Sequence, residues 1–298
     1  MEVSPFLNDL QLRWRSWKAV FAPQLVLLEL QDDCLKGQSH SARRPGPVTI
    51  DTPLPPETCV AGMPLEQEAL GDLIGDLLAR DNLIDGYVLA SLPPEASQWR
   101  VLEWPSADPV PQDPLAALRK LDPPLNLPYS LSDACLDVQP LPRHPNQLLL
   151  AATPRTLVEA WEKVFDLAGV HLDRLAPAQT CLLAGLAPEL TGLGESELVA
   201  VVAPGEEICR LFLLRGDVPV FEKTLPAEPE QMVAEFDRCV AFYRRQDPSC
   251  SGLKVFLSRP WDHAERLVPP GSPSPAEAFC GDYGSLVLQG LASALVAA

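Results

Sequence analysis

Thirty-three prolines in a chain of 298 residues limit how long any one structural element can be. Proline fixes φ and has no backbone N–H, so it ends helices and is tolerated in sheets mainly at edges. The proline content is about twice the usual share of roughly 5%. We therefore predict short elements separated by many proline-containing loops, in one large or two ordinary domains.

The chain is acidic, with 40 Asp plus Glu against 23 Lys plus Arg and a formal net charge of −17. A protein that tracks nucleic-acid phosphates needs a concentrated positive field, so we expect no nucleic-acid partner. Hydrophobic residues make up 47% of the chain, which argues against disorder.

The eight cysteines are widely spaced, and none forms a CxxC motif or lies near one of the four histidines. This pattern excludes an ordinary zinc site and predicts reduced, mostly buried thiols in a cytosolic protein. Charged residues interrupt the N-terminal segment, so we expect no export signal. The apolar stretch from 285 to 298 is shorter than the ~20 residues of a membrane span.

Apolar periodicity places the expected elements along the chain. The expected helices cover residues 7–21, 65–79, 115–120, 155–170, 178–186, 232–245 and the C-terminal segment. The expected strands cover residues 25–30, 34–38, 86–94, 99–104, 147–153, 197–203, 210–216, 218–225 and 253–258. Leu65 is expected among the buried residues of its helix, and residues 39–64 are predicted to be irregular. This order is typical of an α/β protein with mixed sheets.

Several phrases in this order resemble the PilM family, the actin-like cytoplasmic proteins of type IV pilus assembly. They are PLEQEALGDLIGDLL, GYVLASLPP, WRVLEWP, NLPYSLSDACLDVQPL and QLLLAATPRTLVEAWEKVFDLAGVHLDRL. The resemblance covers roughly residues 25–297 and extends to the cell-division protein FtsA and the cytoplasmic domain of GspL. It implies an actin-like (ribonuclease H-like) two-domain α/β fold with mixed sheets and a reduced second domain.

The resemblance also implies a domain plan. Residues 1–24 would form an N-terminal amphipathic helix, and residues 25–175 a first domain with a small inserted subdomain near 95–153. Residues 176–276 would form the second domain, and residues 277–298 a C-terminal helix returning to the first. A short loop after residue 225 replaces a small subdomain of the family.

Actin-like proteins hold ATP with phosphate and adenosine loops, and this chain departs from each of those motifs. In LVLLELQDDCLK, Glu29 and Lys36 match the family, but Gln31 stands for a glycine and Asp32 and Asp33 for hydroxyl residues. Carboxylates at these positions repel phosphate, whereas glycine N–H and hydroxyl groups donate to it.

The second phosphate loop, VAPGEEI, keeps Gly205 but has Glu206 and Glu207 where hydroxyl donors belong. Arg259 and Pro260 replace the glycines of the adenosine loop. We therefore expect a pseudo-ATPase with no catalytic residue, no metal and no cofactor. The alternative is an ATP-binding switch in which Glu29 and Asp32 hold Mg²⁺. By themselves the three acid pairs are interpreted as solvated loop acids: Asp32 with Asp33, Glu206 with Glu207, and Asp133 with Asp137.

The segment 7–21 carries the one basic cluster of the chain, formed by Arg13, Arg15 and Lys18 beside Trp14 and Trp17. One interpretation packs this helix on its own domain. The other makes it a contact to a partner or to the anionic membrane surface.

The resemblance implies a non-catalytic scaffold at the cytoplasmic face of the inner membrane. It would bind the N-terminal peptide of a PilN-like membrane protein, near the helix 65–79, and link it to the pilus motor ATPases, with homo-oligomers as a further expectation. The other alternative is a GspL-like role in type II secretion. Because that family continues into a membrane span and this chain stops at Ala298, the PilM-like role is favoured.

Overall fold

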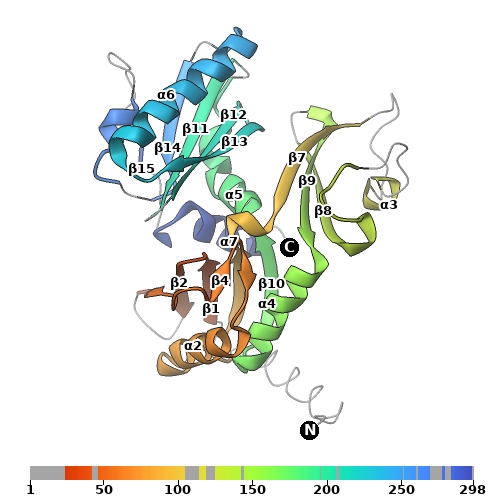
Figure 1. Cartoon of the computed structure of the whole chain (residues 1–298), viewed down its shortest axis with the longest axis vertical. Coiled ribbons are helices and arrows are strands. Elements are labelled where there is room, and N and C mark those ends of the chain that lie inside the picture. Colours follow the sequence, from red (N-terminus) through yellow and green to blue (C-terminus); the bar gives the residue numbers. More distant parts are fainter. Residues whose placement is uncertain are drawn as a thin grey trace. The chain divides into compact units, whose positions relative to one another are not determined.

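The computed structural model divides the chain into two compact units (Figure 1). The first unit contains residues 1–98, 123–136 and 152–179, and the second contains residues 99–122, 137–151 and 180–298. The structure describes residues 24–41, 46–104, 114–118, 125–141, 144–194, 196–205, 208–250, 252–259, 261–268, 277–278 and 283–296. The predicted N-terminal helix lies outside these ranges.

The first unit is built on a five-stranded mixed sheet in the order β10-β6-β1-β2-β3. The central strand β1 (Gln24–Leu30) pairs antiparallel with β2 (Cys34–Ser41), which pairs antiparallel with β3 (Val48–Pro53). On its other side β1 runs parallel to β6 (Tyr87–Leu92), which runs parallel to β10 (Leu172–Pro177). A small hairpin joins β4 (Cys59–Val60) to β5 (Met63–Pro64).

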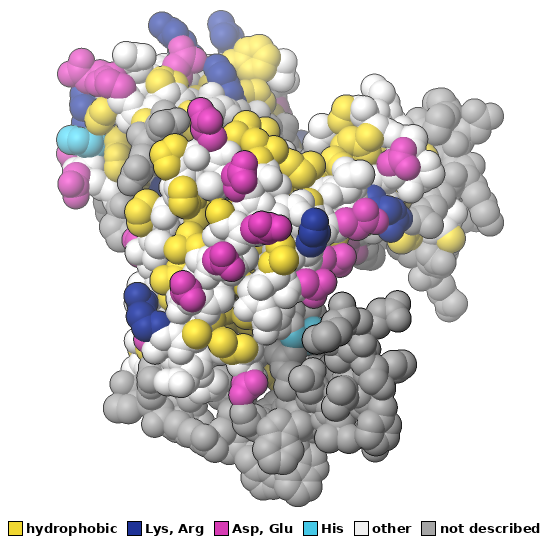
Figure 2. All heavy atoms as spheres, turned by 60° about the horizontal axis from the view of Figure 1, so that its bottom comes forward, with side chains coloured by type: hydrophobic (Ala, Val, Ile, Leu, Met, Phe, Trp, Pro, Cys, Tyr) yellow, Lys and Arg dark blue, Asp and Glu magenta, His cyan; other side chains and the backbone are white. Residues whose placement is uncertain are grey.

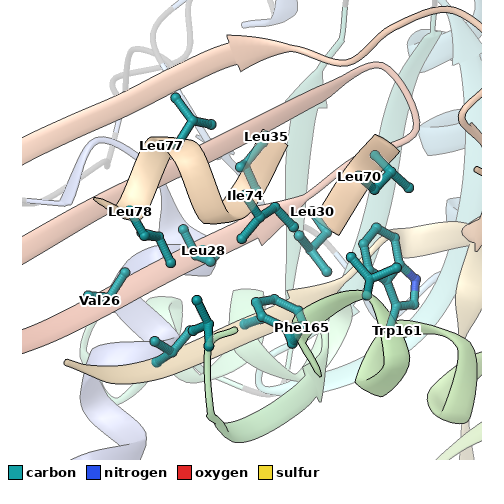
Figure 3. Close-up of a cluster of buried hydrophobic side chains, with 14 of the residues drawn as sticks. Val26, Leu28, Leu30, Leu35, Leu70, Ile74, Leu77, Leu78, Trp161 and Phe165 are labelled. Atoms are coloured by element: carbon teal, nitrogen blue, oxygen red, sulfur yellow. The ribbon is translucent and has the colours of Figure 1, made fainter. Parts of the chain in front are cut away.

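Two helices, α2 (Gln67–Arg80) and α4 (Arg155–Leu167), pack on this sheet. Figure 3 shows Leu70 and Ile74 of α2 and Trp161 and Phe165 of α4 in one apolar cluster with residues of β1. The buried residues of α2 recur at the helical period, and its acidic residues face solvent. Hydrophobic burial against the sheet therefore determines which face of each helix is inward.

The second unit repeats the arrangement with the order β13-β12-β11-β14-β15. Its central strand β11 (Glu197–Pro204) begins an antiparallel meander with β12 (Ile208–Arg215) and β13 (Val218–Pro226). It also runs parallel to β14 (Gly252–Leu257), which runs parallel to the short β15 (Glu277–Ala278).

The helix α6 (Pro229–Gln246) packs on this second sheet through Met232, Phe236 and Val240. The Glu228 carboxylate accepts hydrogen bonds from the N–H groups of Glu230 and Gln231, which caps the helix and lowers the Glu228 pKa. Because β13 ends at Pro226, the prediction of a short loop in place of a subdomain is confirmed.

A three-stranded sheet with the order β7-β9-β8 forms the inserted part, and its α3 is Pro114–Leu118. Its strands are β7 (Gln98–Glu103), β9 (His144–Pro154) and β8 (Ala134–Leu141). Most of this region belongs to the second unit, which corrects its predicted place in the first domain. The Trp99 indole N–H donates to Glu222 of β13, and its ring packs edge-on against Phe212 of β12.

The helices α5 (Ala178–Leu190) and α7 (Leu286–Val296) approach each other through glycines. A Cβ atom at Gly290 would lie 1.7 Å from the Cys181 carbonyl oxygen, and one at Gly185 would lie 2.1 Å from the Leu286 carbonyl oxygen. The structure thus places α7 in the second unit, whereas the sequence predicted its return to the first.

Most predicted elements are confirmed, with two corrections in the segment 39–65. This segment is not irregular, because β2 continues to Ser41 and Val48–Pro53 forms an edge strand with alternating burial. Leu65 is 55% exposed because α2 begins two residues later, at Gln67. Strands β8 and β10 were not predicted.

Among the described residues, no helix is both long and apolar enough to cross a membrane. The described cysteines are free thiols. Cys59, Cys181, Cys209, Cys239 and Cys250 are buried, and Cys34 and Cys135 are partly exposed.

Candidate functional site

In the first unit the candidate nucleotide positions lie at the end of β1 and in its turn to β2. The backbone N–H of Gln31 donates to the Cys34 carbonyl (3.0 Å), which closes the turn. The Gln31 side-chain amide donates to the Glu29 carboxylate (2.7 Å) and accepts from the Cys34 thiol (3.1 Å). Gln31, at the position where the family has glycine, therefore donates a hydrogen bond to the acidic residue Glu29.

Asp32 connects this turn to the β4–β5 hairpin. Its Oδ1 atom accepts hydrogen bonds from the Gly62 backbone N–H (2.8 Å) and the Cys59 thiol (3.3 Å). The Gly62 carbonyl in turn accepts from the Trp161 indole of α4 (2.8 Å). The interpretation of Asp32 as a solvated loop acid is therefore wrong, because its carboxylate is a structural acceptor for a buried N–H group.

Burial of the Cys59 thiol and its contact with Asp32 both favour the protonated form. Burial, together with the negative charge and hydrogen bond of Asp32, raises the pKa of Cys59 far above its ordinary range. Asp33 differs from its neighbour, because its side chain is exposed while its backbone carbonyl accepts a hydrogen bond from the Leu54 N–H (2.8 Å). Lys36 lies directly opposite Glu29 in the β1–β2 register.

In the second unit the corresponding turn follows β11. A Cβ atom at Gly205 would lie 2.2 Å from the Ile208 carbonyl oxygen, so the turn itself requires glycine here. The Arg259 guanidinium lies 3.8 Å from the same Cβ position. Glu206, Glu207 and Pro260 lie outside the described residues. The backbone geometry of the turn therefore explains the glycine at position 205 without a phosphate ligand.

Cys209 lies at the start of β12, where both burial and the charge of Arg259 affect the pKa of its thiol. Burial raises its pKa to about 12, while the positive charge of Arg259 acts in the opposite direction. The chain after β14 is held by two backbone bonds: Ser258 N–H donates to the Val202 carbonyl (2.9 Å), and Leu286 N–H donates to the Ser258 carbonyl (3.1 Å). Ser258, at the start of the candidate adenosine segment, is therefore hydrogen-bonded both to β11 and to the first residue of α7.

The first unit also contains a buried polar group of residues that sequence reasoning missed. Ser97 and Thr153 share a hydrogen bond of 2.7 Å, and the Gln179 amide donates to the carbonyls of Pro94 (2.7 Å) and Ser97 (3.2 Å). Ser91, in β6, is fully buried. A serine inside the otherwise apolar run YVLASL was the signal that could have indicated this group.

In the ranges that the structure describes, no three His, Cys, Asp or Glu side chains gather closely enough to hold an ion. Glu29 and Asp32, the proposed Mg²⁺ ligands of the alternative reading, are bound to Gln31 and to Gly62 and Cys59, respectively.

No family model matches the sequence, and no curated protein matches it. Solved structures, in contrast, do match this chain. A chain of the PilM–PilN type IV pilus biogenesis complex is 21% identical, with a TM-score of 0.61 over 78% of this chain and 80% of that chain. The cytoplasmic domain of EpsL, an inner membrane component of the Vibrio cholerae type II secretion system, is 12% identical. Its TM-score is 0.52 over 92% of this chain and 95% of that chain.

A Bacteroides thetaiotaomicron protein of unknown function with an actin-like ATPase fold is also similar. It has a TM-score of 0.47 and 6% identity over 82% of this chain and 85% of that chain. The chain has the mixed α/β fold of the PilM–PilN complex chain and of the EpsL cytoplasmic domain, the two kinds of relative that the sequence resemblance predicted. At these identities the likeness establishes the fold alone.

Proposed function

We propose that this chain is a non-catalytic scaffold of a type IV pilus or related inner-membrane machine. The observation that carries the proposal is the likeness to the chain from the PilM–PilN complex, which spans four-fifths of both chains. The order of the sequence phrases supports the same relationship. In this proposal the protein works at the cytoplasmic face of the inner membrane and connects a PilN-like partner to the pilus motor ATPases.

The proposed contact is the N-terminal peptide of the PilN-like protein, bound near the amino end of α2. Two large apolar side chains are exposed there, Val60 (50%) and Leu65 (55%). They belong to one local structure, because the Leu65 N–H donates to the Thr58 carbonyl (2.8 Å) at the β4–β5 hairpin. Exposed apolar side chains beside a short hairpin can hold an extended peptide without any chemical step.

The proposed absence of ATP turnover is supported by the β1–β2 turn. Asp32 directs a carboxylate to the Gly62 N–H, so an anion that belongs to the chain already uses this donor. A phosphate at the same turn would meet like charge from Asp32 and Asp33.

A peptide titration tests the scaffold proposal. The probe is a fluorescent synthetic peptide with the N-terminal cytoplasmic residues of a PilN-like protein, and its binding is followed by fluorescence anisotropy. We expect saturable binding, weakened at least about tenfold by Leu65→Glu, because a charge would be desolvated in an apolar contact. The control is Phe242→Glu, an equally drastic change at a 45% exposed residue of the second unit. Absence of binding, or equal loss in both variants, would overturn the proposal.

Calorimetric titration with Mg²⁺ and ATP tests the pseudo-ATPase part separately. We expect no saturable heat up to millimolar nucleotide. Micromolar binding would refute that part and leave the peptide contact to be judged by its own titration.

A further inference from the structure

One stretch of the first unit carries only negative charge. Residues 46–79 contain six acidic side chains and no Lys, Arg or His. Three of the acids, Glu68, Asp72 and Asp76, are exposed and follow at spacings of four, which aligns them along the outer face of α2. Within the part of the chain that the structure describes, no ion pair involves any of these three. The row of like charges therefore opposes the helix that carries it.

Apolar side chains are exposed beside these acids. Leu65, just before α2, is 55% exposed, and Leu167, at the end of α4, is 43% exposed. Leu167 lies against the middle of α2, because its Cβ atom is 2.7 Å from an ideal Cβ position at Gly71. Figure 2 shows one face of the molecule on which acidic side chains lie among apolar ones. We call the following residues the α2 surface: Leu65, Glu68, Asp72, Asp76 and Leu167.

The N-terminal segment of the same chain has the complementary composition. Residues 7–21 contain three basic side chains, two tryptophans and a single acid. The sequence predicts a helix over these residues, which lie outside the described ranges. Basic groups can bind the carboxylates of the α2 surface, and large rings can cover its leucines. The basic residues and tryptophans are Arg13, Arg15, Lys18, Trp14 and Trp17.

The start of β1 lies beside the carboxyl end of α2. The Gln24 carbonyl oxygen, at the first residue of β1, lies 3.3 Å from an ideal Cβ position at Gly86. Gly86 is joined to α2, because its N–H donates to the Leu83 carbonyl (2.9 Å) and the Leu83 N–H donates to the Leu78 carbonyl (2.8 Å). The chain that precedes Gln24 therefore leaves the sheet next to the end of α2.

A helix over residues 7–21 would match α2 in length. Its fifteen residues would rise about 22 Å, and the fourteen residues of α2 rise about 21 Å. If it runs antiparallel to α2 from the carboxyl end of that helix, Lys18 comes level with Asp76 and Arg13 with Asp72. The apolar start of the segment then reaches Leu65.

We propose that residues 7–21 bind the α2 surface of their own chain. The basic side chains neutralise the row of carboxylates, and the tryptophans remove exposed leucine area from water. Only residues 22 and 23 separate the segment from β1. Such a short tether gives an effective concentration on the order of millimolar, so a weak contact is enough to hold the segment in place.

The bound segment controls access to the peptide site, and this consequence rests on the proposed function. The segment covers Leu65, the side chain to which we assign the PilN-like peptide. The peptide must therefore displace the segment before it binds. Its apparent affinity is reduced by the fraction of chains in which the α2 surface is free.

Hydrogen–deuterium exchange of the full chain, read by mass spectrometry, tests the contact. In the wild type we expect protected amides in residues 7–21. They should exchange at least about tenfold faster in the variants Arg15→Glu/Lys18→Glu and Asp72→Lys/Asp76→Lys. Protection should decrease between about 0.1 M and 0.5 M salt, because salt screens the charges. It should not depend on protein concentration, because the contact forms within one chain.

Combining the two charge reversals in one chain is the decisive step, since the reversed segment then complements the reversed surface. We expect protection to return. The control Glu103→Lys/Asp137→Lys makes the same change of charge as the α2 variant, at exposed residues of the second unit, and should leave the protection unchanged. Circular dichroism establishes folding. If a double variant does not fold, Lys18→Glu and Asp76→Lys take its place in the same scheme.

Three results would overturn the proposal: rapid exchange of residues 7–21 in the wild type, protection that survives each reversal, or a combined variant that stays unprotected. Two others would replace it with a different contact. Protection that is lost on dilution would identify a contact between copies. Protection that forms only with anionic phospholipid vesicles would identify a membrane contact.

The peptide titration separates this proposal from the proposed function. The Arg15→Glu/Lys18→Glu variant leaves α2 unchanged, so it should bind the PilN-like peptide at least about threefold more tightly than the wild type. Equal affinities would refute the control of access. If neither chain binds the peptide, the proposed function fails, whereas the exchange experiment alone still decides whether the segment binds α2.

Discussion

The two units have the same sheet arrangement but different chemistry at the turn that follows the central strand. In the first unit the turn after β1 contributes Asp32, which accepts from Gly62 and the Cys59 thiol. In the second, the turn after β11 is built on Gly205 and lies near Arg259. The comparison teaches that one topology can be closed by different local means at equivalent turns: a carboxylate that accepts hydrogen bonds in the first unit, and a glycine that admits the close Ile208 carbonyl in the second.

The helices that cover the two sheets differ in a similar way. α6 has a carboxylate cap at Glu228, and Glu235 pairs with Lys223 (3.0 Å) and Arg238. α2 has no side-chain cap hydrogen bond and exposes a row of like charges. Local electrostatics therefore support α6, whereas α2 depends on apolar packing against the sheet and α4.

The largest expected effect concerns the helix pair of the second unit. Gly290→Ala should lower the free energy of unfolding by about 3 kcal/mol or more, because its methyl group would overlap the Cys181 carbonyl and force α5 and α7 apart. Urea unfolding followed by tryptophan fluorescence measures the change. Gly192→Ala is the control, since nothing lies within 4 Å of its Cβ position. Equal stability of the two variants would contradict the backbone contact.

The next effect tests the anchor of the first unit. Asp32→Ala should cost about 1–3 kcal/mol, because the buried Gly62 N–H loses its acceptor. The neighbouring Asp33→Ala, at an exposed side chain, should change stability by less than about 0.5 kcal/mol. Urea unfolding of both variants is the measurement. If both changes are neutral, Asp32 has no structural role and the contrast between the two turns fails.

The buried thiol of the second unit makes stability depend on pH. The pKa of Cys209 rises from 9.0 to about 12 on folding, so its contribution is complete below pH 9 and is lost as pH rises toward 12. The expected slope is about 1.4 kcal/mol per pH unit for this thiol. Urea unfolding of the wild type and Cys209→Ala at pH 7.5, 9.0 and 10.5 measures it. Relative to the wild type, the variant should gain about 2 kcal/mol between pH 9.0 and 10.5. A constant difference would show that Cys209 does not titrate in this way.

The smallest effect concerns the acidic row of α2. Asp72→Lys should raise stability by about 0.5–1 kcal/mol, because it replaces two repulsive pairs, with Glu68 and Asp76, by two attractive ones. Thermal unfolding at low salt measures the gain, and Asp72→Asn should give about half of it by removing the repulsion alone. A gain that persists unchanged in 1 M salt would argue against an electrostatic cause.

The sequence was most informative where burial follows a regular period. The apolar run of β1 and the spacing of Leu70, Ile74, Leu77 and Leu78 in α2 predicted the correct elements, because a buried face must repeat at the period of its secondary structure. It was least informative for β3 and β10, whose mixed composition gives little contrast between their faces. Edge position, decided by pairing with a neighbouring strand, makes these segments strands.

In the candidate site, too, some properties could be predicted from the sequence and others could not. The acidic replacements at Asp32 and Asp33 could be read from the sequence, and so could their expected repulsion of phosphate. That Asp32 accepts from Gly62, thirty residues away, could not, because this hydrogen bond exists only after the β4–β5 hairpin packs beside the β1–β2 turn. The placement of the inserted strands in the second unit likewise depends on the contact of Trp99 with Glu222, which are 123 residues apart.

The sequence by itself determined the class of fold, the order of most elements and the acidity of the phosphate-loop positions, since these follow from local patterns of apolar and charged residues. Tertiary structure alone decided which acid is a structural acceptor, why Gly205 and Gly290 must be glycine, and which helix faces remain in water. Those properties depend on which distant segments meet, and the free energy of burying or leaving a group exposed is set only when they do.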